Sequence, residues 1–149
     1  MKRSEVTEKI LDIKRMKGWD WADIAKKIDA KQSPFYTTAG LLGQMKLEPA
    51  QAAKAAKLFG LTKMEEKLLA EVPYRGSLPP GPPTDPLIYR FYELVQVYGT
   101  TFKELIQEEF GDGIMSAIDF DMKMERQPDP KGDRVRLTMS GKFLPYKRY

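Results

Sequence analysis

Three polar residues in the second half of the sequence have the types and spacing needed for chemistry: Arg90, Glu93 and Ser116. Arg90 and Glu93 are spaced i, i+3, so on a helix they share one face and can reach each other or a common ligand. Ser116 lies in the segment GDGIMSAI, where it is the only polar side chain between Ile114 and Ile118. An arginine charge, a hydroxyl donor and backbone amides near glycines together favour a site for small oxyanions.

The sequence contains no histidine and no cysteine. Imidazole general bases, thiolate nucleophiles, cysteine zinc sites and nearly all zinc catalytic centres are therefore excluded. Ser116 has no lysine near it in the sequence to act as a base, so hydrogen-bond donation suits it better than nucleophilic attack. A magnesium or manganese site built only from carboxylates stays formally open, but the composition favours an enzyme that works without a metal.

Each of these residues also has a plain structural explanation. The arginine and glutamate can form a surface ion pair worth less than about 1 kcal/mol. The serine hydroxyl can cap a helix or stabilise a turn. Neighbours of the pair are mostly aromatic, namely Tyr89, Phe91 and Tyr92. They predict that part of this face is covered, and a covered arginine needs an anion or a carboxylate beside it.

Two helices are expected to carry the charged pair and to lead to the serine. Asp85, followed by proline, predicts the start of a helix that stops at Gly99. A second helix begins with the capping pattern of Thr101 and Glu104 and ends at Gly111.

A hairpin is expected to follow these helices. Residues 118–125 and 134–140 alternate between apolar and polar side chains, which is the period of half-buried strands, and the turn-rich segment QPDPKGD separates them. Two helices and one hairpin bury too little surface to be stable alone. We therefore expect residues 87–149 to form an intertwined two-fold dimer with a second chain.

The first half of the sequence, residues 1–71, predicts a bundle of short helices. Asp20, Ser33 and Thr62 stand where helix caps are expected. Such a bundle resembles helix-turn-helix DNA-binding domains, in which the second helix of the motif enters the major groove. The corresponding segment, residues 33–45, contains no lysine or arginine. Because DNA contacts rely heavily on those side chains, we expect the bundle to serve packing and assembly, with no nucleic-acid partner.

Residues 72–86 hold six of the chain's 11 prolines, which predicts a stiff linker between domains at 1–71 and 87–149. The expected fold is mainly α with a small α+β C-terminal part. A composition of 42% hydrophobic and 31% charged residues is that of a globular protein. No apolar run of about 18 residues is long enough to span a membrane, and the N-terminus lacks the apolar core of a signal peptide. We expect a cytoplasmic protein that has no membrane partner.

The stretch from residue 84 to residue 120 resembles the C-terminal signature of the cyanase family, the bicarbonate-dependent cyanate lyases. The shared segments are TDP, YRFYE, QVYGTT, FGDGI and SAI in this order, with GKFLPYKRY at the C-terminus and AGLLGQ in the first half. The resemblance implies that the catalytic residues are Arg90, Glu93 and Ser116. It also implies apolar contacts to the substrates from Ile114 and Leu144.

The family resemblance further implies a reaction and an assembly. Bicarbonate joins cyanate to give a carboxylated carbamate, which loses carbon dioxide, and the remaining carbamate breaks down to ammonia and a second carbon dioxide. No metal or organic cofactor is implied, since bicarbonate is a co-substrate. The implied assembly is a decamer of five dimers with active sites shared between subunits.

Two other hypotheses remain open at this stage. In the first, the protein is a helix-turn-helix transcription regulator whose C-terminal domain dimerises and senses a small anion. In the second, it is a catalytically inactive relative that serves assembly alone.

Overall fold

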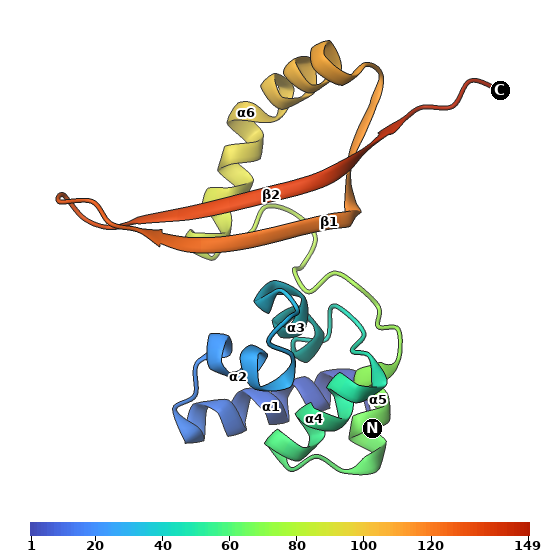
Figure 1. Ribbon diagram of the computed structural model, residues 1–149, viewed down its shortest axis with the longest axis vertical. Helices are drawn as coiled ribbons and strands as arrows, with labels where there is room; N and C mark the ends of the chain where they lie inside the picture. The colour runs from blue at the N-terminus through green and yellow to red at the C-terminus, as the bar shows by residue number, and fades with distance from the viewer. The chain divides into compact units, whose positions relative to one another are not determined.

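The computed structural model describes residues 1–149. Five short helices are followed by one long helix and a two-stranded sheet (Figure 1). Confirming the fold class expected from the sequence, the chain is mainly α with a small β hairpin near its C-terminus. It divides into two compact units, one made of Met1–Ser77 and Met122–Leu137 and the other of Leu78–Asp121 and Thr138–Tyr149.

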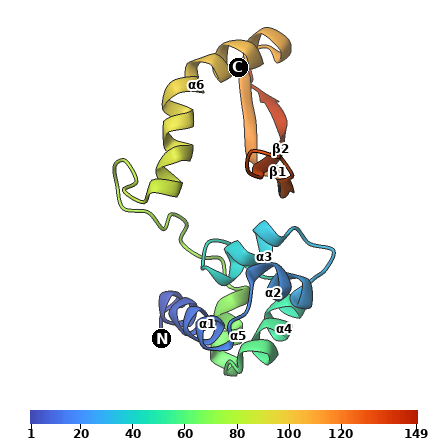
Figure 2. The same ribbon diagram turned by 90° about the vertical axis from the view of Figure 1, so that its left-hand side faces the viewer.

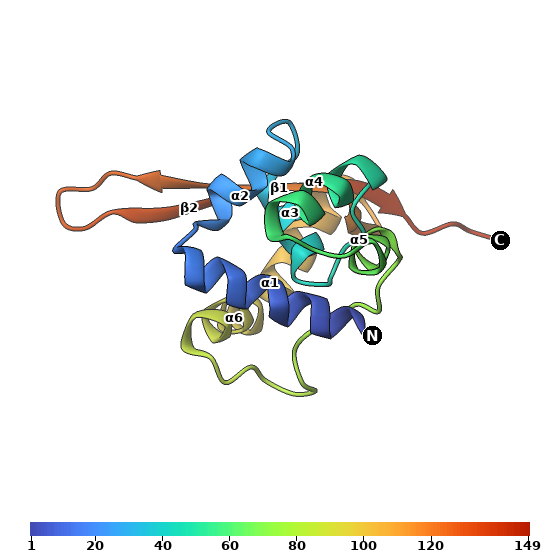
Figure 3. The same cartoon turned by 90° about the horizontal axis from the view of Figure 1, so that it is seen from below.

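The five short helices form a bundle, seen from two further sides in Figures 2 and 3. They are α1 (Arg3–Lys17), α2 (Trp21–Ile28), α3 (Pro34–Leu41), α4 (Pro49–Phe59) and α5 (Lys63–Ala70). Local chemistry sets their ends. Gly18 ends α1 in the left-handed region at a φ of 62°, and the Ser33 hydroxyl accepts a hydrogen bond from the amide of Phe35 at the start of α3. Asp20 stands at the N-cap of α2 as expected, but its side chain makes no capping hydrogen bond.

A continuous apolar core holds the bundle together. Its buried members are Val6, Ile10, Ile24, Ile28, Leu41, Leu47, Ala52, Ala55, Phe59 and Leu69. They come from all five helices and from the loop after α3, and the packed pairs are α4 with α5, α2 with α3, α1 with α5 and α2 with α4. Trp19 lies edge-on against Phe59, with ring centroids 5.8 Å apart. This bundle has a core of its own.

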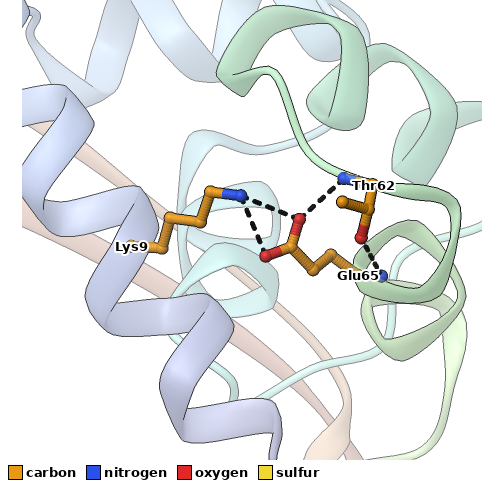
Figure 4. Close-up of polar contacts among 3 residues, drawn as sticks. All are labelled: Lys9, Thr62 and Glu65. Carbon is orange, nitrogen blue, oxygen red and sulfur yellow. Dashed lines mark hydrogen bonds and ion pairs between the residues drawn. The ribbon is translucent and has the colours of Figure 1, made fainter. Parts of the chain in front are cut away.

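One buried carboxylate ties α1 to α5 (Figure 4). The Glu65 side chain accepts two hydrogen bonds of 2.9 Å from Lys9 Nζ and one of 2.6 Å from the Thr62 amide. Thr62 Oγ1 in turn accepts from the Glu65 amide at 3.3 Å, which completes the expected capping box. These hydrogen bonds, from the Thr62 amide first and from Lys9 second, stabilise the carboxylate and hold the pKa of Glu65 below its ordinary value.

Glu65→Gln is expected to lower the free energy of unfolding of the bundle by about 1–2 kcal/mol at pH 7, because the cap and the ion pair both weaken. A carboxylate with a depressed folded-state pKa contributes stability above its ordinary pKa of 4.5 and loses it as the pH falls through the folded-state value. The difference between wild type and variant should therefore shrink below about pH 4.5. Urea unfolding between pH 3 and pH 7 measures it, with Glu66→Gln as the control because Glu66 pairs only with the exposed Lys63.

The expectation of two helices in the second half is wrong, because α6 (Pro86–Phe110) is one helix of 25 residues. It begins as expected, since the Asp85 side chain accepts hydrogen bonds from the amides of Leu87 and Ile88 at 2.9 and 3.0 Å. Gly99 does not end it. Gly99 is absent from the glycines with positive φ, so it keeps helical geometry, and a glycine inside a helix costs only about 1 kcal/mol relative to alanine. The ribbon of α6 bends midway along its length (Figures 1 and 2).

The hairpin is confirmed and is longer than expected. Its strands are β1 (Gly113–Gln127) and β2 (Arg134–Pro145), which are neighbours in the sheet. Near its start β1 turns through a sharp corner before its long straight part (Figure 1). The alternation of side chains that marked the strand begins only at Ile118, because residues 114–118 are apolar except for the serine.

The helix α6 buries none of its residues within the chain. Large apolar side chains are exposed along its whole length, among them Leu87, Phe91, Val95, Val97, Phe102, Leu105 and Phe110. On β1, Ile118 is 97% exposed. An apolar surface of this extent is typical of an interface with another chain. No helix of the chain combines the length and the apolarity needed to cross a membrane.

Candidate active site

Arg90 and Glu93 form an ion pair on the first half of α6. Arg90 Nη1 donates to Glu93 Oε2 at 2.6 Å, as the i, i+3 spacing predicts. The guanidinium also lies over the ring of Tyr89, with Cζ 5.5 Å from the ring centroid. Within the single chain the two side chains are 65% and 46% exposed. Water therefore screens the pair in the single chain, and an anion can approach the guanidinium.

Ser116 lies on β1 and is only 4% exposed. Its Oγ accepts hydrogen bonds from two backbone amides, those of Ile118 at 3.0 Å and Asp119 at 2.9 Å. A serine oxygen has two lone pairs and one proton. Both lone pairs are occupied by amides, so the proton is the part of the hydroxyl left to form a further hydrogen bond.

This arrangement decides which chemistry the serine can perform. A nucleophilic serine attacks with a lone pair and needs a base to take its proton. Here the lone pairs face two N–H groups, and the chain has no histidine. Two donors to the oxygen also polarise the O–H bond, which makes the hydroxyl a stronger hydrogen-bond donor. The geometry suits donation to an anion.

Ile114 lies near the start of β1 and Leu144 near the end of β2, at the open end of the hairpin. The backbone of β1 at Gly113 runs against the carbonyl of Leu144 on β2, which places Ile114 and Leu144 close to each other along the paired strands. Both side chains are exposed in the single chain. Phe110, at the end of α6, packs against Phe143 with ring centroids 5.3 Å apart. This contact fixes the end of the helix to the same part of the hairpin.

The chain brings some of the expected site residues together and leaves others apart. Arg90 contacts Glu93, and Ser116 contacts its own strand, but no hydrogen bond or ion pair of the chain joins Ser116 to Arg90 or Glu93. No group of three or more carboxylates is placed to hold a metal ion. The amides of Ile118 and Asp119 were missed by sequence reasoning, because no side-chain pattern marks a backbone donor.

Comparison with known proteins gives a consistent result over the whole chain. The family model described as "Cyanate hydratase, N-terminal" matches residues 3–73, and the one described as "Cyanate lyase C-terminal domain" matches residues 80–148. The cyanate hydratases of Variovorax paradoxus (strain S110) and Methylibium petroleiphilum are each 62% identical over 149 residues, which is 100% of both chains. That of Polaromonas sp. is 60% identical over the same length.

A solved structure agrees with these relatives. The crystal structure of cyanase from T. urticae superposes with a TM-score of 0.77 at 35% sequence identity, covering 94% of this chain and 96% of that one. The similarity therefore extends from the sequence of both halves to their fold. Matched by models of both domains and by relatives along its full length, this chain belongs to the cyanate hydratase (cyanate lyase) family.

Proposed function

We propose that this protein catalyses the bicarbonate-dependent decomposition of cyanate to ammonia and carbon dioxide. The observation that carries the proposal is the 62% identity, over the full length of both chains, to the cyanate hydratase of Variovorax paradoxus. We propose Arg90, Glu93 and Ser116 as the catalytic residues, with Ile114 and Leu144 in contact with the substrates.

The proposed reaction begins when a bicarbonate oxygen forms a bond to the carbon of cyanate. The product is a carboxylated carbamate, in which the nitrogen has received the proton of bicarbonate and one further proton. The bond between the bicarbonate carbon and the bridging oxygen then breaks, which releases one carbon dioxide and leaves carbamate. Carbamate takes a further proton and separates into ammonia and the second carbon dioxide. In total one cyanate, one bicarbonate and two protons give one ammonia and two molecules of carbon dioxide.

The main obstacle is to hold two anions together long enough to react. Two unit charges 4 Å apart repel by about 4 kcal/mol in a partly desolvated site. In the proposal the Arg90 guanidinium offsets this repulsion and the Ser116 hydroxyl donates a hydrogen bond to the combined anion. Because the guanidinium and the hydroxyl donor are in place before the reaction, the site needs little reorganisation during it. Glu93, which contacts Arg90 at 2.6 Å, orients the guanidinium and assists proton movement.

We further propose that the site is completed between chains. Two observations support this: no direct polar contact joins Ser116 to the Arg90–Glu93 pair within one chain, and α6 buries none of its residues within the chain. The assembly we propose is the one implied by the family resemblance, a decamer of five dimers. Sedimentation of the purified protein gives its mass in solution, and a monomeric mass at working concentrations contradicts this part of the proposal.

Ammonia release from cyanate, measured with and without added bicarbonate, tests the proposed reaction. We expect ammonia to appear only when bicarbonate is present, at two molecules of carbon dioxide for each ammonia. Buffer degassed of carbon dioxide is essential, since dissolved carbon dioxide supplies bicarbonate. An equal rate in bicarbonate-free buffer would show that water, not bicarbonate, attacks cyanate.

A DNA-binding assay with the same purified protein tests the hypothesis of a transcription regulator, which the family assignment does not favour. Regulatory binding to DNA predicts sequence-selective affinity that falls steeply with salt. We expect no such binding, because α3 contains no lysine or arginine.

A further inference from the structure

Gly141 on β2 faces the segment of β1 that holds Ser116. A Cβ atom built on Gly141 would clash with the carbonyl oxygen of Ser116 and would lie 2.7 Å from Met115 Cγ. It would also lie 3.3 Å from Phe120 Cδ2. The backbone dihedral angles of Gly141 do not require a glycine, since its φ is not among the positive values. The glycine is therefore required by the close approach of the two strands and not by its own conformation.

This approach bears directly on the serine. The Ser116 carbonyl belongs to the backbone of a residue whose hydroxyl is held by the amides two and three positions later. A backbone atom cannot move aside as the end of a flexible side chain can. If the carbonyl shifts, the Cα of Ser116 and its buried hydroxyl shift with it.

We infer that Gly141 is a positioning residue for the proposed active site: the absence of a side chain at Gly141 sets the position from which the Ser116 hydroxyl donates a hydrogen bond to the bound anion. The inference rests on the proposed function for the identity of that anion. It assigns to Gly141 no contact with the substrates. A displacement of about 1 Å at a reacting group is sufficient to lower a rate by about 10²-fold.

The experiment compares four chains: wild type, Gly141→Ala, Ser116→Ala and the double variant. The probe is azide, a linear triatomic anion with the same charge as cyanate, and isothermal titration gives both its dissociation constant and the number of competent sites. We expect Gly141→Ala to weaken azide binding about tenfold or more, as loss of a hydrogen bond to a charged group does. The double variant should bind no more weakly than Ser116→Ala alone, because both changes remove the same interaction.

A purely structural role for Gly141 gives a different result. In that case Gly141→Ala lowers the number of competent sites, while the remaining sites bind azide with an unchanged dissociation constant. This result would overturn the inference. Losses that multiply in the double variant would overturn it too, because they show that Gly141 acts independently of Ser116. Gly132→Ala is the control for strain in the same hairpin, because a φ of 124° disfavours alanine there although no atom lies within 4 Å of the added carbon. It strains the turn without crowding Ser116. Its affinity for azide should equal that of wild type.

Met115→Ala covers the case in which Gly141→Ala does not fold. In the combined variant Met115→Ala/Gly141→Ala, the crowded Met115 side chain is gone, while the clash of the added carbon with the Ser116 carbonyl remains. Binding as tight as in Met115→Ala alone would overturn the inference. Cyanate turnover is measured separately. A wild-type chain that binds azide through Ser116 and releases no ammonia from cyanate would contradict the proposed function and leave the role of Gly141 standing.

Discussion

Arg90→Leu is expected to lower kcat/KM for cyanate by about 10³-fold or more, the range measured for arginines that stabilise charge in a transition state. We expect this loss because two anions must bind in one site, and leucine has no positive charge to offset their repulsion. The charge of Glu93 would also lose its partner and add to that repulsion. Ammonia release at saturating bicarbonate, over a range of cyanate concentrations, gives both kcat and KM.

The hairpin offers a matched control for this substitution. Arg126 pairs with Asp133 at 3.0 Å, and its side chain is exposed like that of Arg90. Arg126→Leu also removes a surface ion pair, yet it should leave kcat/KM within about twofold of wild type, because such pairs contribute little. Arg90→Lys keeps the charge and loses the planar fork, so we expect intermediate activity. If Arg90→Leu keeps a near-normal rate while its oligomer is intact, Arg90 does not bind the reacting anions.

The second large effect is expected for Ser116→Ala, with kcat reduced by about 10²- to 10³-fold, the cost of removing one preorganised donor. A loss of stability should accompany it. Without Oγ the amides of Ile118 and Asp119 lose their acceptor, and a buried donor left unpaired costs about 1–3 kcal/mol. Steady-state kinetics and thermal unfolding of the same preparation separate the two consequences.

Ser140→Ala is the control for this change, because Ser140 lies on the neighbouring strand and is exposed. It should alter neither the rate nor the melting temperature measurably. Because a loss of stability in Ser116→Ala would also lower the apparent kcat, the two proteins are compared only at temperatures where both are folded and fully assembled. A Ser116→Ala enzyme with wild-type kcat and a lowered melting temperature would mean that the hydroxyl serves the strand alone.

Helix boundaries that depend on local hydrogen bonds were predictable from the sequence. Ser33 before proline and the capping box of Thr62 and Glu65 begin helices as expected, since the hydrogen bonds involved lie within three residues of one another. The partner of Glu65 was not predictable. Lys9 lies 56 positions away, and only the packing of α1 on α5 brings the two together.

The prediction that Gly99 ends a helix is wrong, because a glycine after an apolar stripe indicates a helix end only when nothing beyond it favours continuation. The pattern of Thr101 and Glu104 predicts the start of a second helix, but the same residues also fit the interior of a long one. No proline lies between Gly99 and the end of α6 at Phe110 to break the hydrogen-bond ladder. A cost of about 1 kcal/mol is then too small to divide the helix.

The geometry of the candidate site was predictable only in part. The i, i+3 spacing correctly predicted the contact of Arg90 with Glu93, because helix geometry is regular. For Ser116 the sequence suggested either a turn hydroxyl or an anion donor. The hydroxyl accepts from two amides and still retains its proton, so the two roles are compatible. Gly141 had no sequence signal, since the crowding that requires it involves a residue 25 positions earlier in the chain.

The contrast between the bundle's own core and the exposed apolar surface of α6 has a consequence for how the protein loses its structure. The bundle buries its own apolar core within one chain, so its melting temperature should not depend on protein concentration. α6 has no buried residue until other chains cover it, so its stability is set by mass action and rises with protein concentration. Within one chain, the stability of one half should therefore be independent of protein concentration, whereas that of the other half should depend on it. If the active site is completed between chains as we propose, dilution alone should inactivate the protein while more than half of its helices remain intact.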